Sequence, residues 1–257
     1  MTMRDIADFW NRRPCNMRHS PLPVGTPAYF AQVRERRYFV EPHIPRFADF
    51  PAWGGKRVLD VGCGIGSDTA MFLSHGAFVT AIDASPSSLE LARLQAEAIG
   101  CERNARFILG DAEHLAWWLE PQCFDLIWCW GVAHHTPNPQ CMVDGFAQFM
   151  NAASVIRIML YHTWSLKSAL IALGLAWSEA QAGVPISRRY TRQAAARLLA
   201  DYEIVDIAVG HIFPYQIADY VQYRYVKRWL WRVLPPGLFR RLERTFGEHL
   251  CITARLK

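Results

Sequence analysis

A run of glycines directly follows the first strongly apolar segment of the chain. The segment, residues 58–66, reads VLDVGCGIG, with glycines at alternate positions and Asp60 just before them. Glycines let the backbone approach a ligand closely at the N-terminus of the helix that follows. A carboxylate at Asp60 would repel a pyrophosphate and attract a positively charged ligand group. The pattern therefore favours a nucleoside-like ligand with a cationic end.

Two further acidic residues come at the ends of later apolar runs. Asp83, followed by Ala84, lies 17 residues after Gly66, where one carboxylate can accept both hydroxyls of a ribose. Asp111 follows a third run and offers an acceptor for an adenine amino group, with the Ala112 backbone for a ring nitrogen. Each acid alone can equally cap a helix or form a turn. The three in this order favour S-adenosylmethionine, whose methionyl end carries an ammonium and a sulfonium.

Candidate catalytic residues follow the fourth and fifth apolar runs. His134 and His135 come after the fourth run, and Tyr161 and His162 end the fifth, so we expect all four at one crevice. A histidine there can take a proton from a substrate hydroxyl or amine, because an unperturbed imidazole titrates at about pH 6.5. A structural histidine bonded to the backbone, or packing of the loop, is the alternative. The stretch 211–215 (HIFPY) follows the sixth run and should face the same crevice.

The histidines and cysteines form no metal-binding motif in the sequence. Histidines at the ends of adjacent strands can gather a metal ion, but no carboxylate accompanies them at short spacing. The cysteines, at positions 15, 63, 101, 123, 129, 141 and 251, show no CxxC spacing. We therefore expect neither a metal site nor a disulfide framework. The odd number of cysteines favours a reducing compartment.

Short apolar runs alternate with helical patterns along the chain. The expected strands are residues 57–61, 78–82, 106–109, 124–128, 155–160 and 203–209, and the expected helices are 66–75, 86–99, 139–151, 165–180 and 191–200. This order predicts an α/β fold with a doubly wound, mostly parallel sheet built from βαβ units. A last run at 250–256 alternates as an antiparallel edge strand does.

The segments VLDVGCGIG, VTAIDAS, GDAEHL and FDLIWCWGVAHHTPNP resemble class I S-adenosylmethionine-dependent methyltransferases of the small-molecule type. The resemblance covers residues 56–160 well and the rest more loosely. It implies a seven-stranded sheet with an antiparallel last strand, and cofactor contacts from Asp60, Gly62, Gly64, Asp83, Ala84, Asp111, Ala112 and Trp130. GVAHHTPNP is similar to the fourth-strand loop of small-molecule enzymes, including quinone-biosynthesis types. It departs from the NPPY-type signature of amino-group methyltransferases acting on nucleic acid or glutamine.

Two kinds of segment lie outside the expected sheet. Residues 1–50 should form an N-terminal cap or lid, and residues 51–257 the methyltransferase domain, with insertions at about 161–190 and on the substrate side at 211–248. From 220 to 257 there are nine basic residues against two acidic ones, interleaved with aromatic residues. Such a segment fits a lid over an anionic substrate, a weak peripheral membrane contact, a nucleic-acid face or a plain solvated helix face.

Composition and charge exclude several classes of protein. Of the 257 residues, 51% are hydrophobic and 20% charged, which excludes a disordered tail or a fibre. A net charge of +5 is too small to indicate nucleic acid by itself. The charged N-terminus is unlike a signal peptide, and no apolar run is long enough to cross a membrane. We therefore expect a soluble cytoplasmic protein.

The expected reaction is transfer of the methyl group of S-adenosylmethionine to oxygen or nitrogen of a small-molecule acceptor, by in-line displacement at the sulfonium. No stable binding of nucleic acid is expected. A macromolecular acceptor such as tRNA is the main alternative. A nicotinamide-dependent oxidoreductase is disfavoured by Asp60 and the GxGxG spacing, and a noncatalytic binding module by the polar residues His134, His135, Tyr161 and His162.

Overall fold

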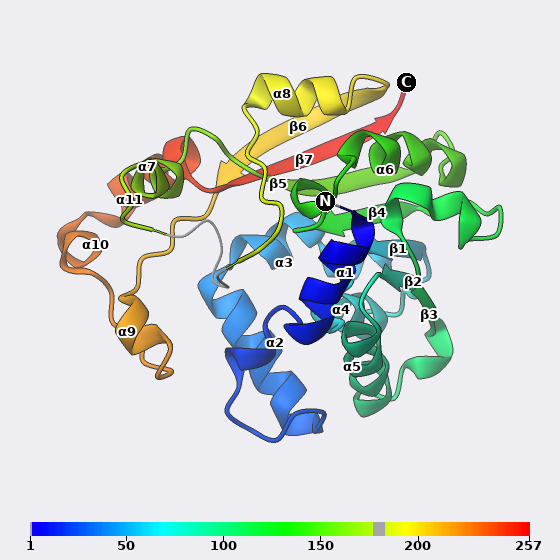
Figure 1. The fold of residues 1–257 in the computed structure, drawn as a ribbon, viewed down its shortest axis with the longest axis horizontal. Helices are drawn as coiled ribbons and strands as arrows, with labels where there is room; N and C mark the ends of the chain where they lie inside the picture. The colour runs from blue at the N-terminus through cyan, green and yellow to red at the C-terminus, as the bar shows by residue number, and fades with distance from the viewer. Residues whose placement is uncertain (1, 177–182) are drawn as a thin grey trace.

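A seven-stranded sheet runs through the computed structural model, which describes residues 2–176 and 183–257 (Figure 1). The strand order is β3-β2-β1-β4-β5-β7-β6, and β7 is antiparallel to both of its neighbours. The remaining pairs are parallel. The strands are β1 (Arg57–Val61), β2 (Phe78–Asp83), β3 (Ala105–Leu109), β4 (Leu126–Trp130), β5 (Val155–Tyr161), β6 (Tyr202–Gly210) and β7 (His249–Leu256). The α/β sheet with an antiparallel last strand is therefore confirmed.

Two strand predictions need correction. β7 is not an edge strand, because it lies between β5 and β6, and its first four residues are buried. The edges of the sheet are β3 and β6. β4 runs from Leu126 to Trp130 rather than over 124–128, because the Phe124 N–H donates to the carbonyl of Phe149, outside the strand ladder. Trp130 therefore ends β4 instead of following it.

Helices cover both faces of this sheet, as βαβ connections require. α3 (His43–Ala48), α4 (Ser67–Ser74) and α5 (Pro86–Ala98) contribute to the core on one face, and α6 (Pro139–Phe146) and α8 (Arg192–Leu198) to the core on the other. Short 3₁₀ helices are η1 (Met17–His19), η2 (Phe50–Trp53), η3 (Glu102–Asn104), η4 (Ala112–Trp117), η5 (Ala133–His135) and η6 (Ala147–Phe149). Ser85 caps α5 by accepting from Ser88 N–H, as its place before Pro86 predicts.

The N-terminal segment packs against this framework. α1 (Met3–Arg12) contacts α5, and α2 (Pro27–Val40) buries Tyr29, Phe30 and Val33 in a cluster that includes side chains of α5. α3 places Ile44 and Ala48 in the same core as strand residues of the sheet. Residues 43–50 are thus continuous with the core of the sheet.

The later segments gather beyond one end of the strands, at the left of Figure 1. They contain α7 (Leu166–Ala172), α9 (Ile217–Tyr220), α10 (Trp229–Val233) and α11 (Pro236–Phe246). α7 is shorter than the predicted helix 165–180, because Gly174, with φ +70°, ends it in a left-handed turn closed by Leu175 N–H to the carbonyl of Leu170. Residues 177–180 of that prediction lie outside the described residues.

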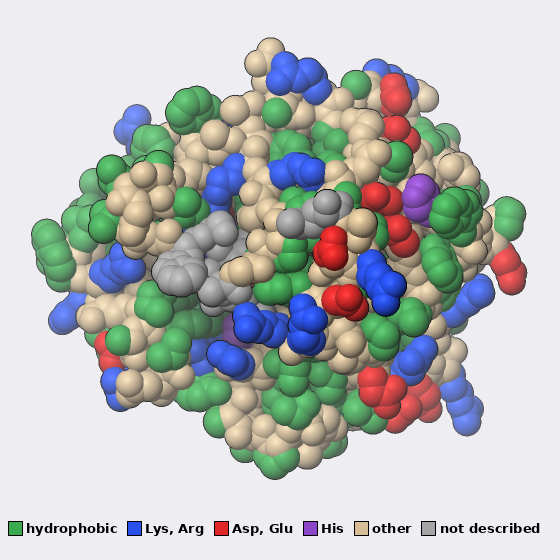
Figure 2. Space-filling view, viewed as in Figure 1, with side chains coloured by type: hydrophobic (Ala, Val, Ile, Leu, Met, Phe, Trp, Pro, Cys, Tyr) green, Lys and Arg blue, Asp and Glu red, His purple; other side chains and the backbone are tan. Residues whose placement is uncertain are grey.

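The surface over α10 and α11 is apolar and basic. Trp229 and Val233 are 73% and 69% exposed, and Arg232 and Arg240 lie close by in the chain. Hydrophobic and basic side chains are interspersed at this left end of the molecule in Figure 2. None of the helices in the described part of the chain is long and apolar enough to cross a membrane.

Candidate active site

A cavity of about 940 Å³ lies at the carboxyl ends of the central strands. Its walls come from the glycine loop after β1, from the ends of β2, β4 and β5, and from α1 and the end of α2. Residues 166–176 and 211–231 contribute further lining. Parallel α/β sheets bind ligands at this edge, so the fold brings most of the sequence-predicted residues to one place.

The glycine loop has the geometry that its spacing predicts. Gly62, Gly64 and Gly66 have φ of +69°, +55° and +82°, which side chains rarely adopt. A Cβ atom at Gly62 would lie 2.2 Å from Cγ2 of Val132, whereas a Cβ atom at Gly64 would meet nothing within 4 Å. Gly62 is therefore required by packing, and the backbone at Gly64 is open to a ligand in the cavity.

Asp60 lies beneath this loop at the end of β1. It lines the cavity, is 2% exposed, and accepts a hydrogen bond of 2.5 Å from Oγ1 of Thr69 in α4. Burial raises the pKa of its carboxyl to about 7, with the nearby Asp68 as the next cause. A cationic ligand group would stabilise the ionised form, so the site suits an ammonium.

Asp68, which the sequence analysis missed, holds the N-terminal segment onto the glycine loop. Its carboxylate accepts from Arg37 at 2.8 Å, from the Tyr38 hydroxyl at 2.8 Å and from the Trp128 indole at 3.1 Å. This network joins α2, α4 and β4, and its ion pair with Arg37 is buried. The only signal in the sequence is an acid in the first turn of the helix after the glycines.

Asp83 at the end of β2 holds the glycine loop in place. One carboxylate oxygen accepts from Gly64 N–H and the other from Ser85 N–H, both at 2.8 Å. Burial raises the pKa of Asp83, and the hydrogen bonds from Ser85 and Gly64 oppose this shift. Asp83 and Ala84 both line the cavity. The ribose contact expected of Asp83 stays a prediction.

The third acid is placed differently. Asp111 precedes η4 as its N-cap and accepts from Glu113 N–H at 2.8 Å, which is the capping role weighed as its alternative. Among the described residues the cavity lining includes its neighbours Gly110 and Ala112 but not Asp111. The residues that follow β3 therefore reach the cavity. An adenine contact from the Asp111 carboxylate stays a prediction. Trp130, at the end of β4, lines the cavity as expected.

His135 is the sequence-predicted histidine that faces the cavity from the fourth-strand loop. Its Nδ1 lies 2.6 Å from the carbonyl oxygen of Ile186. Because a carbonyl only accepts, we assign the proton to Nδ1, which leaves the lone pair of the neutral ring on Nε2. Burial lowers the pKa of His135 to about 4, so the expectation of an unperturbed imidazole is wrong. Trp10 of α1 approaches the same ring, with centroids 5.4 Å apart.

Of the other three catalytic candidates, Tyr161 is the one that the described cavity lining includes. Tyr161 lines the cavity, and His134 is fully buried behind it, with stacked ring centroids 3.8 Å apart. His162 turns its Nδ1 toward the carbonyl of Gly247 at 3.2 Å, because successive residues of an extended chain point to opposite sides. Neither His134 nor His162 is among the described residues that line the cavity. Catalytic roles for all three stay predictions.

A cluster of histidines and glutamates lies beside the cavity, and the sequence motifs indicated only part of it. The ring centroid of His211 lies 5.2 Å from that of His43 and 4.7 Å from that of His249. Glu41 and Glu248 flank these rings. Burial lowers the pKa of His43 to about 2 and that of His249 well below the usual range. The carboxylates of this cluster come from distant parts of the chain, so the lack of a carboxylate at short spacing in the sequence does not exclude a metal here.

Segments outside the sheet cover this cavity. Met3, Ile6 and Trp10 line it from α1, and His211, Ile212 and Phe213 line it from the HIFPY stretch, whereas Tyr215 packs on Phe39. The two covers are joined by Arg36 of α2, which donates to the carbonyl of Tyr220. Its guanidinium lies 4.0 Å and 4.3 Å from the ring centroids of Tyr220 and Tyr223.

Comparison with known proteins agrees with this fold. A family model described as a methyltransferase domain matches residues 58–152. Ubiquinone biosynthesis O-methyltransferase of Coxiella burnetii (strain Dugway 5J108-111) is 39% identical over 93 residues, 36% of this chain and 38% of that protein. The same enzyme of Xylella fastidiosa (strain 9a5c) is 38% identical over 96 residues, 37% of this chain and 38% of that protein. The chain thus spans about two fifths of the length of the curated relatives it matches.

Solved structures match over nearly the whole chain at low identity. Magnesium protoporphyrin IX methyltransferase (ChlM) from Synechocystis PCC 6803 with bound SAH has a TM-score of 0.64 at 15% identity, covering 99% of this chain and 100% of that one. The [4+2]-cyclase SpnF has a TM-score of 0.64 at 16% identity, covering 99% and 96%. At such identities the likeness shows the fold.

The sheet order and the glycine loop define a class I methyltransferase fold. The methyltransferase-domain model that matches residues 58–152 agrees with this fold and with the motifs in that segment.

Proposed function

We propose that the protein transfers the methyl group of S-adenosylmethionine to a hydroxyl of a small-molecule acceptor. The observation that carries the proposal is the convergence of Asp60, Asp83 and the open backbone of Gly64 on one wall of a cavity that also contains His135 and Tyr161. The curated relatives, which match about two fifths of the chain, include O-methyltransferases, and a structure with the same fold holds SAH.

The cavity residues fit this cofactor. Asp60 would pair with the methionyl ammonium, and Asp83 would accept the ribose hydroxyls. Gly110 and Ala112 would lie against the adenine, with Trp130 at the methionyl side. When bound, the cofactor supplies an electrophilic methyl group on its sulfonium. The task of the chain is to hold an acceptor oxygen in line with that methyl group, since orientation accounts for much of the rate in such a displacement.

His135 is our candidate for removing the acceptor proton. Its Nδ1 is bonded to the carbonyl of Ile186, so the lone pair on Nε2 is the group that can accept a proton. The lowered pKa keeps the ring neutral at pH 7, ready to accept but weakly basic. Proton transfer therefore has to accompany methyl transfer or be assisted by another group that acidifies the acceptor.

The covered, largely apolar cavity favours a small acceptor over a macromolecule. Leu166, Leu170, Ile217 and Trp231 line it from the segments after β5 and β6. We propose that residues 1–50 and 211–248 act as its cap and substrate-side cover, since both contribute lining. A cytoplasmic setting, where thiols stay reduced, would suit the free cysteines.

Methyl transfer to defined probes tests this function. The full chain, incubated with S-adenosylmethionine labelled in its methyl group, would be offered a set of catechols with and without an alkyl tail, and separately bulk tRNA. Mass spectrometry should find a methyl ether on a catechol, dependent on Asp83, and more product from the tailed probes. Label found only in the tRNA fraction would overturn the small-molecule proposal.

A further inference from the structure

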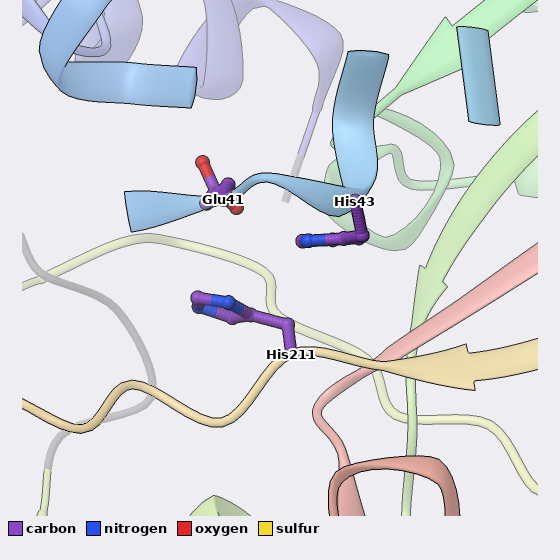
Figure 3. Close-up of side chains that lie close together, drawn as sticks. All are labelled: Glu41, His43 and His211. Atoms are coloured by element: carbon purple, nitrogen blue, oxygen red, sulfur yellow. The ribbon is translucent and has the colours of Figure 1, made fainter. Parts of the chain in front are cut away.

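Three side chains of metal-ligand type converge beside the cavity. Glu41 directly follows α2, His43 begins α3 and His211 follows β6, and Figure 3 shows all three turned toward one gap. One oxygen or nitrogen atom from each lies within 4.8 Å of the others. Glu41 and His211 also line the cavity. Three separate elements thus present their donor atoms to one point.

We propose that Glu41, His43 and His211 form a binding site for a divalent transition-metal ion of the Zn²⁺ class. Two imidazole nitrogens and one carboxylate oxygen suit zinc, iron and cobalt, whereas Mg²⁺ and Ca²⁺ prefer oxygen donors alone. Bonds of about 2.0–2.2 Å to one ion place neighbouring donor atoms roughly 3–3.5 Å apart. The donor atoms of the three side chains lie within 4.8 Å of one another, so they would have to move closer together to bind one ion.

The contacts of the surrounding groups support this choice of ligands. Glu248, the other nearby carboxylate, already pairs with Lys167 at 2.9 Å and with Arg189 at 3.3 Å, so two cations compete with a metal for it. Oε1 of Glu41 lies 3.8 Å from Nδ1 of His249, a longer contact than either of those and one that is an ion pair only when His249 is protonated. Glu41 is therefore the better placed carboxylate ligand.

His249 stands next to the site. Its Nδ1 lies 2.9 Å from Nε2 of His43, and the two imidazoles form a hydrogen bond. That spacing is close to the distance between two donor atoms on one metal. His249 would either stay hydrogen-bonded to His43 while His43 binds the metal, or bind the metal itself as a fourth ligand. In both cases Glu41, His43 and His211 remain the three proposed ligands.

The site borders the place where the acceptor should react, which links this inference to the proposed function. The ring centroid of Trp130, at the end of β4, lies 5.4 Å from that of His43. Three protein ligands leave coordination positions open, and a metal there would bind the acceptor hydroxyl and lower its pKa. The acceptor hydroxyl would then lose its proton more easily, even to a base as weak as His135.

Metal binding can be measured without cofactor or acceptor. Tag-free chain stripped with a chelator would be titrated with ZnCl₂ by calorimetry and with CoCl₂ by visible absorption. We expect one equivalent to bind, and Glu41→Gln, His43→Ala and His211→Ala each to weaken binding by at least about tenfold. His114→Ala removes a histidine outside the cluster and should bind as the wild type does.

Two controls test the choice of ligands and the folding of the variants. Glu248→Gln should keep wild-type zinc affinity; a loss with Glu248→Gln and none with Glu41→Gln would overturn the proposed ligand set. Titration of each variant with S-adenosylhomocysteine shows whether it is folded and separates this inference from the proposed function. Wild-type zinc affinity in folded His43→Ala and His211→Ala proteins would overturn the site altogether.

Discussion

Gly62 and Val132 touch so closely that no side chain fits between them. A Cβ atom at Gly62 would lie 2.2 Å from Cγ2 and 2.9 Å from Cγ1 of Val132. Gly62 belongs to the loop after β1, and Val132 immediately precedes η5, which contains His135. The wall proposed for the cofactor is thus packed directly against the loop proposed to act on the acceptor.

This contact predicts that Gly62→Ala is far more damaging than an alanine at another left-handed glycine. Overpacking adds about 1–3 kcal/mol to the strain of a positive φ. Gly76→Ala is the matched control, since Gly76 has φ +84° and its added Cβ would meet nothing within 4 Å. Urea unfolding measures both. Equal losses would contradict the packing argument, and Val132→Ala should partly rescue Gly62→Ala.

Asp60 should make cofactor binding release protons. Its raised pKa of about 7 means that its carboxyl is partly protonated in the free protein at neutral pH. A bound ammonium lowers that pKa, so protons leave on binding and affinity rises between pH 6 and pH 8. Calorimetry with S-adenosylhomocysteine in buffers of different ionisation enthalpy measures the release. Asp60→Asn should remove the proton release, and proton uptake in the wild type would contradict the ammonium pairing.

His135 should matter for turnover without titrating near neutrality. Its pKa of about 4 predicts that kcat/KM is insensitive to this group above about pH 5 and falls below it as the base is protonated. His135→Ala should lower kcat by about 10² to 10⁴ and leave cofactor affinity within a few-fold. His114→Ala serves as the control. Wild-type kcat in His135→Ala would remove the residue from the mechanism and make Tyr161 the next to test.

The sequence predicted the parts of this site that depend on local pattern. Glycines with positive φ and acids at strand ends follow from short motifs, and six of the seven strands lie within one residue of their expected ends because apolar runs define them. The error in β4 came from Phe124, which is apolar and buried but is held outside the ladder by Phe149.

What could not be predicted depends on contacts between distant residues. Glu41 and His43 meet His211 only because α2 and α3 fold back over the end of β6 (Figure 3). The alternation in residues 250–256 predicted an edge position for β7, because alternation cannot show that β6 pairs with its other side. The low pKa of His135 likewise results from burial under Trp10 and other groups that no motif reveals.

Arg36 should hold the two covers of the cavity together. Arg36→Ala removes a charged hydrogen bond to Tyr220 and the stacking on Tyr223, at a cost of about 2 kcal/mol. We expect faster amide exchange in residues 217–225. Arg34→Ala, which breaks a bond to Gln95 of α5 instead, should leave those residues unchanged. Unaltered exchange in Arg36→Ala would show that the covers do not depend on this contact.

A calorimetric titration with S-adenosylhomocysteine shows whether this cavity binds the cofactor, and whether it does so through Asp83. We expect one site per chain and at least about tenfold weaker binding by Asp83→Ala, which loses charge-assisted hydrogen bonds. Asp144→Ala, on the exposed side of α6, should bind as the wild type does. Absence of binding to the folded wild-type chain, or equal affinity in Asp83→Ala, would contradict the account.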